Sequence, residues 1–330
     1  MSPSAKPAHD ILAGYISGAT VELAKVREKD GQIRLSGQGS FVSRDFSDFE
    51  SILNLYLKQH KGEISHVCLG VAGPVIVNEV RTTNLPWHLN SEDIERRFSF
   101  QRVQLLNDIV AFAYGLTGLP RDRFYMLNGQ GPLSGGNMGV IAAGAGLGEA
   151  LVYAAGGRHH PYASEGGHAG FSPSTQLETE LWQYIYGEDG FVEVEDVLSL
   201  AGLERIYNFV IDSEGSTVAS WFEKAADKPS AIVEKALSGK DKKASQTLDI
   251  FIDCLASEAA NLALKGMTLG GVYFGGLIVP RIITLLDEGR FMNRFVRPGK
   301  MESILARMPV GVVIEERTAL LGAASVALRM

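Results

Sequence analysis

An alternating pattern at the start of the chain places the strongest constraint on its fold. Apolar and polar residues alternate from Ile11 to Ser43, with breaks at Gly18 and Gly31. This period is typical of antiparallel strands joined by tight turns. Helical spacing follows over 46–61, and the apolar run 66–77 predicts a buried strand. A meander followed by a helical crossover predicts a mixed sheet and an α/β fold.

The rest of the chain continues with helices and strands. We expect a helix from Ser91, a strand at 103–106, a helix at 109–116, which packs on that sheet, and a second run of strand beginning near Met138. Most of the chain from there to Lys265 is expected to be helical, and the longest helix, 241–266, carries a core-facing apolar stripe. The last expected elements are a strand at 271–274, a helix at 279–286, a strand at 310–314 and a helix at 318–328.

Composition limits the classes of function. A chain of 330 residues with 45% hydrophobic residues is long enough for two domains or one large two-lobed fold. Its net charge is −7, and no run of basic residues is long enough to contact the phosphate backbone of a nucleic acid. Nucleic acid is therefore not an expected partner. No apolar run reaches the roughly 20 residues of a membrane helix, and the polar start lacks a signal-peptide core, so we expect a cytoplasmic protein without a membrane partner. The only cysteines, Cys68 and Cys254, do not predict structural zinc.

The segment 163–171 contains a carboxylate and an imidazole around two glycines. Glu165 and His168 flank Gly166 and Gly167 in an otherwise apolar setting. Glycine permits positive φ and a close approach of a ligand to the backbone, so both side chains can reach neighbouring hydroxyls. A tight turn with solvated ends explains this segment equally well.

Asn107 and Asp108 end a predicted strand and open a predicted helix. Both residue types are favoured helix caps, and the helix dipole stabilises an anion there. Ligands also gather beyond the carboxyl ends of strands, where a carboxylate can take a proton from a hydroxyl. Capping and catalysis are both open for Asp108.

Two further polar positions have ordinary structural explanations. Asn84 stands in a loop with Pro86 and Trp87, which suits a sugar ring but also an ordinary turn with a packing tryptophan. Glu195 stands at the start of an apolar helical run, where acids are common.

Three glycine-bearing segments end predicted strands, at 14–20, 142–148 and 270–276. Each is able to place backbone N–H groups around phosphate. The second is followed by a predicted strand at 149–154 and not by a helix, so a hairpin turn explains it nearly as well.

Taken in order, these segments resemble the bacterial-type glucokinase family of the hexokinase and actin-like ATPase superfamily, over almost the whole chain. The resemblance is carried by 70–75, 83–87, 106–108, 144–148, 164–168, 195–199, 270–273 and 280–281. It implies a two-lobed, ribonuclease H-like α/β fold, with mixed sheets flanked by helices and a ligand cleft between the lobes. The small α/β domain would comprise 1–117 plus 317–330, and the large helix-rich domain 118–316. A homodimer is also expected.

The resemblance further implies ATP-dependent phosphorylation of glucose or a related hexose at the 6-hydroxyl, with Mg²⁺. Asp108 matches the family's general base. The positions expected to bind the sugar are Asn84, Asn107, Asp108, Glu165, His168 and Glu195. The positions expected to bind the nucleotide are Gly18, Thr20, Gly144, Ala145, Gly146, Gly275 and Gly276. No residue is expected to be a resident metal ligand.

The chain departs from the family pattern on the nucleotide side. The family's first phosphate loop reads Asp-x-Gly-Gly-Thr-Asn, whereas the matching positions here run from Tyr15 to Thr20 without that acid. Ala145 replaces a threonine of the second loop, and Leu277 replaces a glycine of the adenosine loop. These changes support an alternative, a catalytically impaired sugar-binding or sensing protein with an intact glucose site. A zinc-bearing repressor and sugar-kinase group fits less well, because no cysteine cluster follows His168.

Overall fold

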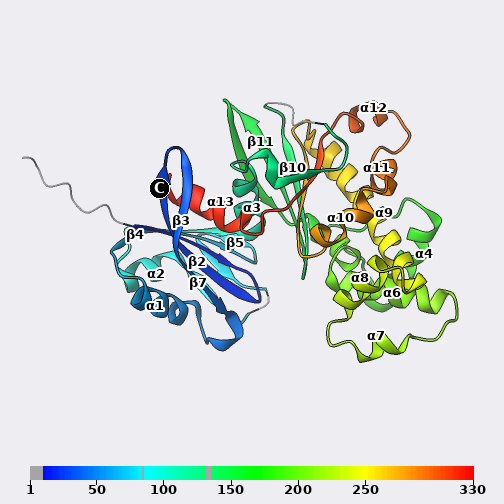
Figure 1. The fold of residues 1–330 in the computed structure, drawn as a ribbon, viewed down its shortest axis with the longest axis horizontal. Coiled ribbons are helices and arrows are strands. Elements are labelled where there is room, and N and C mark those ends of the chain that lie inside the picture. Colours follow the sequence, from blue (N-terminus) through cyan, green and yellow to red (C-terminus); the bar gives the residue numbers. More distant parts are fainter. Residues whose placement is uncertain (1–9, 84, 131–134) are drawn as a thin grey trace, which may run out of the picture. The chain divides into compact units, whose positions relative to one another are not determined.

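The chain forms two compact units. The computed structural model describes residues 10–83, 85–130 and 135–330. The first unit comprises the described residues up to Pro120 together with 315–330, and the second comprises 121–314. The chain therefore leaves the first unit and returns to it at the C-terminus (Figure 1). No helix in the described ranges is long and apolar enough to span a membrane.

The first unit is built on a five-stranded mixed sheet with the order β3-β2-β1-β4-β8. Its first three strands pair antiparallel, whereas β4 and β8 continue the sheet in parallel with β1. The strands are β1 (Asp10–Ile16), β2 (Thr20–Lys29), β3 (Gln32–Val42), β4 (Ile64–Val71) and β8 (Arg102–Asn107). The predicted meander and mixed sheet are confirmed.

The strand predicted over 66–77 is wrong in its second half. β4 ends at Val71, and the chain turns at Gly73, whose φ of +130° suits glycine. The following residues enter a separate three-stranded sheet. Its strands are β5 (Val75–Ile76), β6 (Glu79–Arg81) and β7 (His88–Asn90).

Alternation along β1 sends neighbouring side chains to opposite faces of the main sheet. Leu12 packs in a core with α1 (Phe49–Gln59) and α2 (Ser91–Phe98). Ala13 packs in a second core with α3 (Asp108–Leu116) and α13 (Thr318–Ala327). The C-terminal helix, red in Figure 1, thus covers strands from the start of the chain.

The second unit contains a six-stranded sheet with the order β12-β11-β10-β13-β14-β9. Its strands are β9 (Phe124–Met126), β10 (Met138–Ala143), β11 (Leu147–Ala155), β12 (Arg158–Ser164), β13 (Gly271–Gly276) and β14 (Val310–Val313). The helical prediction for most of the chain after Met138 is wrong for β12. This edge strand contains two histidines and Pro161 and lacks an apolar run, so only its pairing with β11 defines it as a strand.

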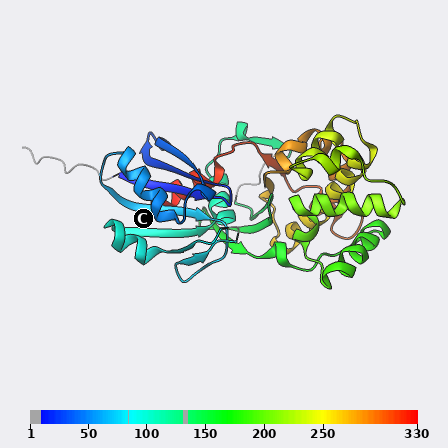
Figure 2. The same ribbon diagram turned by 90° about the horizontal axis from the view of Figure 1, so that it is seen from below.

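Helices occupy most of the rest of the second unit, and α4 to α9 gather beside its sheet (Figures 1 and 2). The longest is α9 (Lys242–Gly266), which Asp241 caps by accepting from the backbone N–H groups of Lys243 and Ala244. Its predicted apolar stripe is buried in the core. The remaining helices are α4 (Gln176–Asp189), α5 (Val194–Val197), α6 (Leu200–Ser213), α7 (Ser220–Lys224), α8 (Lys228–Leu237), α10 (Ile283–Leu286), α11 (Arg290–Phe295) and α12 (Glu302–Leu305). Short 3₁₀ turns are η1 (Ser43–Asp45), η2 (Arg121–Arg123), η3 (Gly166–His168) and η4 (Val279–Ile282).

Candidate active site

Asn107 and Asp108 lie where β8 passes into α3. The Oδ1 atom of Asn107 accepts from the backbone N–H of Ile109 at 3.1 Å, and its Nδ2 donates to the carbonyl of Gly73 at 3.0 Å. Asp108 is the first residue of the helix, and its Oδ1 also accepts from Ile109, at 2.8 Å. The N-cap is therefore Asn107, and the helix N-terminus stabilises the negative charge of Asp108.

Tyr15 lies within electrostatic reach of Asp108. It stands opposite Glu22 of β2 and in register with Gly70 of β4. A Cβ at Gly70 would lie 3.6 Å from the Tyr15 ring and 2.7 Å from the Cβ of Ala111 in α3, so this glycine admits both neighbours. Burial, and then the charges of Asp108 and Glu22, raise the pKa of Tyr15 well above its ordinary value. A protonated phenol thus stands where the family pattern has an acid.

The turn between β1 and β2 contains Gly18 and Thr20. The backbone N–H of Ser17 donates to the carbonyl of Thr20 at 2.9 Å, and the N–H of Thr20 donates to the Ser17 hydroxyl at 3.0 Å. The two hydroxyl oxygens are 3.1 Å apart. These polar groups therefore form hydrogen bonds with one another within the turn. The phosphate-binding role of Gly18 and Thr20 stays a prediction.

Asn84 lies outside the described residues, and its proposed contact with sugar stays a prediction. Around it, the Thr82 hydroxyl donates to the carbonyl of Leu85 at 2.7 Å. Trp87 is 4% exposed and belongs to the core beneath α1 and α2. The packing interpretation of this tryptophan is confirmed.

Three predicted sugar ligands come together in the second unit. Glu165 precedes η3, His168 ends it, and Glu195 lies in the short helix α5. A hydrogen bond to Glu193 raises the pKa of His168, as do the charges of Glu195, Glu193 and Glu165, whereas burial lowers it. Glu165 and His168 are both exposed, while Gly167 is buried against the backbone of Leu147. The loop is a tight turn that also gathers three hydrogen-bonding side chains.

Glu193 is a residue of this cluster that the sequence did not indicate. Its Oε2 lies 2.7 Å from the Nδ1 of His168. Its proximity to Glu195 in the chain was the only signal available, and acids near helix starts are too common to distinguish it.

The glycine segment 144–148 contains the turn of the β10–β11 hairpin, because Ala143 pairs with Leu147. The hairpin interpretation is confirmed. The Oε2 atom of Glu195 accepts from the backbone N–H of Leu147 at 2.6 Å, and the carbonyl of Gly144 accepts from Leu200 at 2.8 Å. A predicted sugar-binding carboxylate thus directly supports a predicted phosphate loop.

Gly275 and Gly276 lie beside this hairpin, because β13 runs parallel to β10. Gly276 has a φ of +86°, and the N–H of Leu277 donates to the carbonyl of Ala143 at 2.8 Å. The Leu277 side chain is 61% exposed, and its Cγ would lie 3.6 Å from a Cβ at Gly144. The two glycine segments are therefore neighbours, with an exposed leucine beside them.

Glu149 is a buried acid beneath the η3 loop. It pairs with Ser164 across β11 and β12 and is only 3% exposed. Burial, and then the charge of Glu258, raise its pKa to about 8. Its Oε1 has no hydrogen-bond partner among the described residues.

Comparison with known proteins supports the family that the order of the sequence motifs indicated. The model of the family described as Glucokinase matches residues 12–330. The chain belongs to the glucokinase family. A glucokinase of Nostoc punctiforme is 32% identical, with 97% of this chain and 99% of the relative covered. A glucokinase of Synechocystis is also 32% identical, with coverage of 96% and 97%.

Solved structures of glucokinases share the fold. The crystal structure of a glucokinase from an Antarctic psychrotroph superposes with a TM-score of 0.84 at 29% identity, covering 97% of this chain and 99% of that one. A glucokinase from Balamuthia mandrillaris, solved with glucose, has a TM-score of 0.82 at 20% identity, with coverage of 98% and 94%, and shows the fold alone. The predicted family, α/β fold class and hexose kinase type of enzyme are confirmed.

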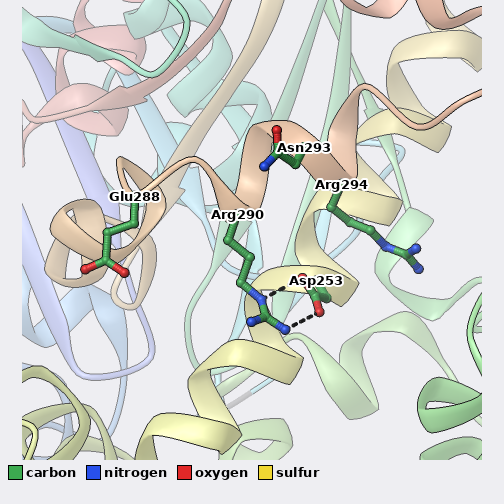
Figure 3. A pocket seen from close by; sticks show the side chains of 5 residues that line it. All are labelled: Asp253, Glu288, Arg290, Asn293 and Arg294. Carbon is green, nitrogen blue, oxygen red and sulfur yellow. Dashed lines mark hydrogen bonds and ion pairs between the residues drawn. The ribbon is translucent and has the colours of Figure 1, made fainter.

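Figure 3 shows a pocket of about 490 Å³, and none of its lining residues belongs to the glucokinase motifs. Its lining residues are Asp253, Glu288, Arg290, Asn293 and Arg294. Arg290 donates to both carboxylate oxygens of Asp253, at 2.9 and 2.6 Å, and Arg294 pairs with Glu178 at 2.6 Å. These arginines are engaged by acids, and they tie α11 to α9 and α4.

Proposed function

We propose that this protein is a glucokinase that transfers the terminal phosphoryl group of ATP to the 6-hydroxyl of glucose. The observation that carries the proposal is the family match over residues 12–330. The clustering of Glu165, His168 and Glu195 in the second unit supports it from the structure, because all three side chains can form hydrogen bonds with hydroxyls. A related hexose has the same chemistry and is the natural comparison substrate.

The proposed sugar ligands are polar groups that suit hydroxyls. Carboxylates accept hydrogen bonds, and a histidine ring offers a donor and an acceptor. The ligands we propose are Asn84, Asn107, Asp108, Glu165, His168 and Glu195. Glu195 has one oxygen on the N–H of Leu147, and we infer that its other oxygen binds the sugar.

We infer that Asp108 is the general base. As the 6-oxygen forms its bond to the transferred phosphorus, the bond from phosphorus to the ADP oxygen breaks and Asp108 takes the hydroxyl proton. Its position at the start of α3 supports this role, because the helix N-terminus holds a carboxylate in place.

The backbone turns at 144–146 and 275–276 fit a nucleotide. Both contain glycines at the ends of neighbouring parallel strands, where N–H groups can approach phosphate. ATP supplies the phosphoryl group to be transferred. No group of three acidic, histidine or cysteine side chains within the described ranges forms a metal site. We therefore expect Mg²⁺ to be held mainly by ATP phosphates and water.

The alternative is a sugar-binding protein without turnover. Tyr15, Ala145 and Leu277 favour it, because each replaces a residue type that serves phosphate, metal or nucleotide in the family pattern. Losing one polar group of this kind costs on the order of 10²–10³ in rate. Both candidate functions require the glucose site, but only the kinase forms glucose 6-phosphate.

The test combines glucose-binding calorimetry with a sensitive assay for glucose 6-phosphate, using ATP, ADP and polyphosphate in parallel. We expect binding of glucose and formation of product with ATP. Tight binding without product from any donor would refute the kinase and support the sugar-binding alternative. Binding of neither glucose nor another hexose would refute both. Sedimentation of the same preparation tests the expected homodimer.

A further inference from the structure

Backbone pairing holds His168 and Glu193 in fixed register. The segment after η3 runs beside the segment before α5, with an isolated antiparallel bridge between Gly170 and Glu193. The N–H of Phe171 donates to the carbonyl of Val192 at 2.8 Å. On the other side of the bridge, the N–H of Val194 donates to Ala169 at 2.9 Å. The contact between the two side chains is therefore a product of the loop's own structure.

The side-chain contact specifies where the histidine carries its proton. The Oε2 of Glu193 and the Nδ1 of His168 are 2.7 Å apart, and the two side chains are 33% and 52% exposed. A carboxylate only accepts hydrogen bonds, so the proton of this bond is on Nδ1. The Nε2 atom is then the ring nitrogen that remains for another partner. It accepts when the ring is neutral and donates when the ring is charged.

Hydrogen bonds and ion pairs that do not involve His168 hold the backbone of Glu193 in place. Its backbone N–H donates to the Oδ2 of Asp196 at 2.9 Å. Arg205 of α6 pairs with Asp196 and also with Asp189, the latter at 3.1 Å. These bonds hold the start of α5 independently of the histidine.

Among the described residues, the charged groups that act on His168 are acidic. They are Glu165 from the loop before η3, Glu193 from the start of α5, and Glu195 within α5. Arg205, which pairs with Asp196 behind Glu193 in the chain, is engaged by Asp189 and Asp196. Glu165 and Glu195 present only side-chain acceptors to sugar hydroxyls, so a charged His168 would add a side-chain donor beside them.

We propose that Glu193 is a positioning residue of the sugar site, which holds the Nδ1 proton of His168 and directs Nε2 to a hydroxyl of the hexose. The inference rests on the proposed function, because it takes His168 as a sugar ligand. It makes glucose affinity depend on pH through His168. Binding tightens as the pH falls through the titration of the ring, because the charged ring donates a stronger hydrogen bond.

The test compares wild type, Glu193→Gln and Asp189→Asn. The first variant removes the charge beside His168 and keeps the side-chain size, whereas the second removes a charge elsewhere on the Arg205 network. Long-range proton–nitrogen NMR of labelled histidines reports the tautomer and the titration midpoint. The chain has seven histidines, and His168→Gln assigns the signal. Calorimetry then gives the Kd for glucose from pH 5.5 to 8.5.

In wild type, at pH values above the titration midpoint, we expect the neutral ring to carry its proton on Nδ1. In Glu193→Gln we expect the titration midpoint of His168 and the pH dependence of glucose affinity to move together to lower pH. At pH 7 the Kd should rise about threefold to tenfold, since hydrogen bonds to charged groups are the stronger ones. Asp189→Asn should behave as wild type. Thermal midpoints should change little, because a half-exposed ion pair contributes little to folding.

The following results would overturn the inference and leave the proposed function intact. They are a proton on Nε2 in wild type, an unchanged His168 midpoint in Glu193→Gln, and equal shifts in Glu193→Gln and Asp189→Asn. Glucose binding whose pH dependence is the same with and without Glu193 contradicts the positioning role alone. A wild-type protein that binds no hexose contradicts the proposed function as well, so the two failures are distinguishable.

Discussion

At the scale of single residues, Asp108 carries the proposed chemistry. Asn107 caps α3, so replacing the Asp108 carboxylate leaves the cap intact. We expect Asp108→Asn to lower kcat about 10²–10⁴-fold, the usual contribution of a general base. The KM for glucose should change much less. Steady-state kinetics of glucose 6-phosphate formation measures both, and unchanged kcat in this variant would refute the assignment.

The raised pKa of the buried Glu149 carboxyl predicts that the free energy of unfolding depends on pH. Its pKa is raised from 4.5 to about 8 in the folded protein, so the folded state binds a proton more tightly than the unfolded state between these values. The free energy of unfolding should therefore fall as pH rises from about 4.5 to 8. Glu149→Gln removes this loss and should be about 1–4 kcal/mol more stable than wild type at pH 8, with little difference at pH 5.

Urea unfolding at several pH values measures this difference. Glu223→Gln, a change at an exposed acid, serves as the control and should follow wild type. If Glu149→Gln and wild type lose stability in parallel between pH 5 and pH 8, Glu149 is not the group responsible.

At the scale of elements, α3 and α13 approach closely through glycines. A Cβ at Gly322 would meet the backbone of Ala111 and lie 2.6 Å from the backbone nitrogen of Gly115. We expect Gly322→Ala to lower the free energy of unfolding by about 1–3 kcal/mol, because overpacking forces the helices apart.

The matched control is Gly187→Ala in α4. A Cβ at Gly187 meets no heavy atom within 4 Å, so alanine should stabilise the helix by up to about 1 kcal/mol. Urea unfolding of both variants tests the contact, and equal effects would contradict a close approach of α3 and α13.

At the scale of the whole molecule, the first unit depends on the last residues of the chain. The core over β1 and β4 is completed by Leu320, Ala323 and Ala324 of α13. Ending the chain after Arg317 should expose this core and remove hydrogen-exchange protection from β1 and β4. The amides of α9 should stay protected, because they pack in the separate core of the second unit. Uniform loss of protection, or none, would contradict this division.

Much of the fold follows from local pattern. Alternation over 11–43 predicted β1 to β3, and the apolar stripe predicted α9. Asp108 was expected at a helix start, because the strand predicted at 103–106 ends just before it and the helix predicted at 109–116 begins just after it. The order of short motifs along the chain indicated the glucokinase family, which the family match confirmed. Each of these features is a pattern that can be read along the sequence, and none of them requires knowing which distant segments pack together.

The tertiary structure decided the contacts between distant segments. β12 is a strand only through its pairing with β11, and α13 covers a sheet whose last strand in the sequence ends at Asn107. Glu193 meets His168 across 25 residues, and Glu149 is buried by the loop above it. No local period reports such contacts, because they depend on how the chain packs against itself. The sequence determined which chemical groups the protein carries, and the packing decided which of them touch.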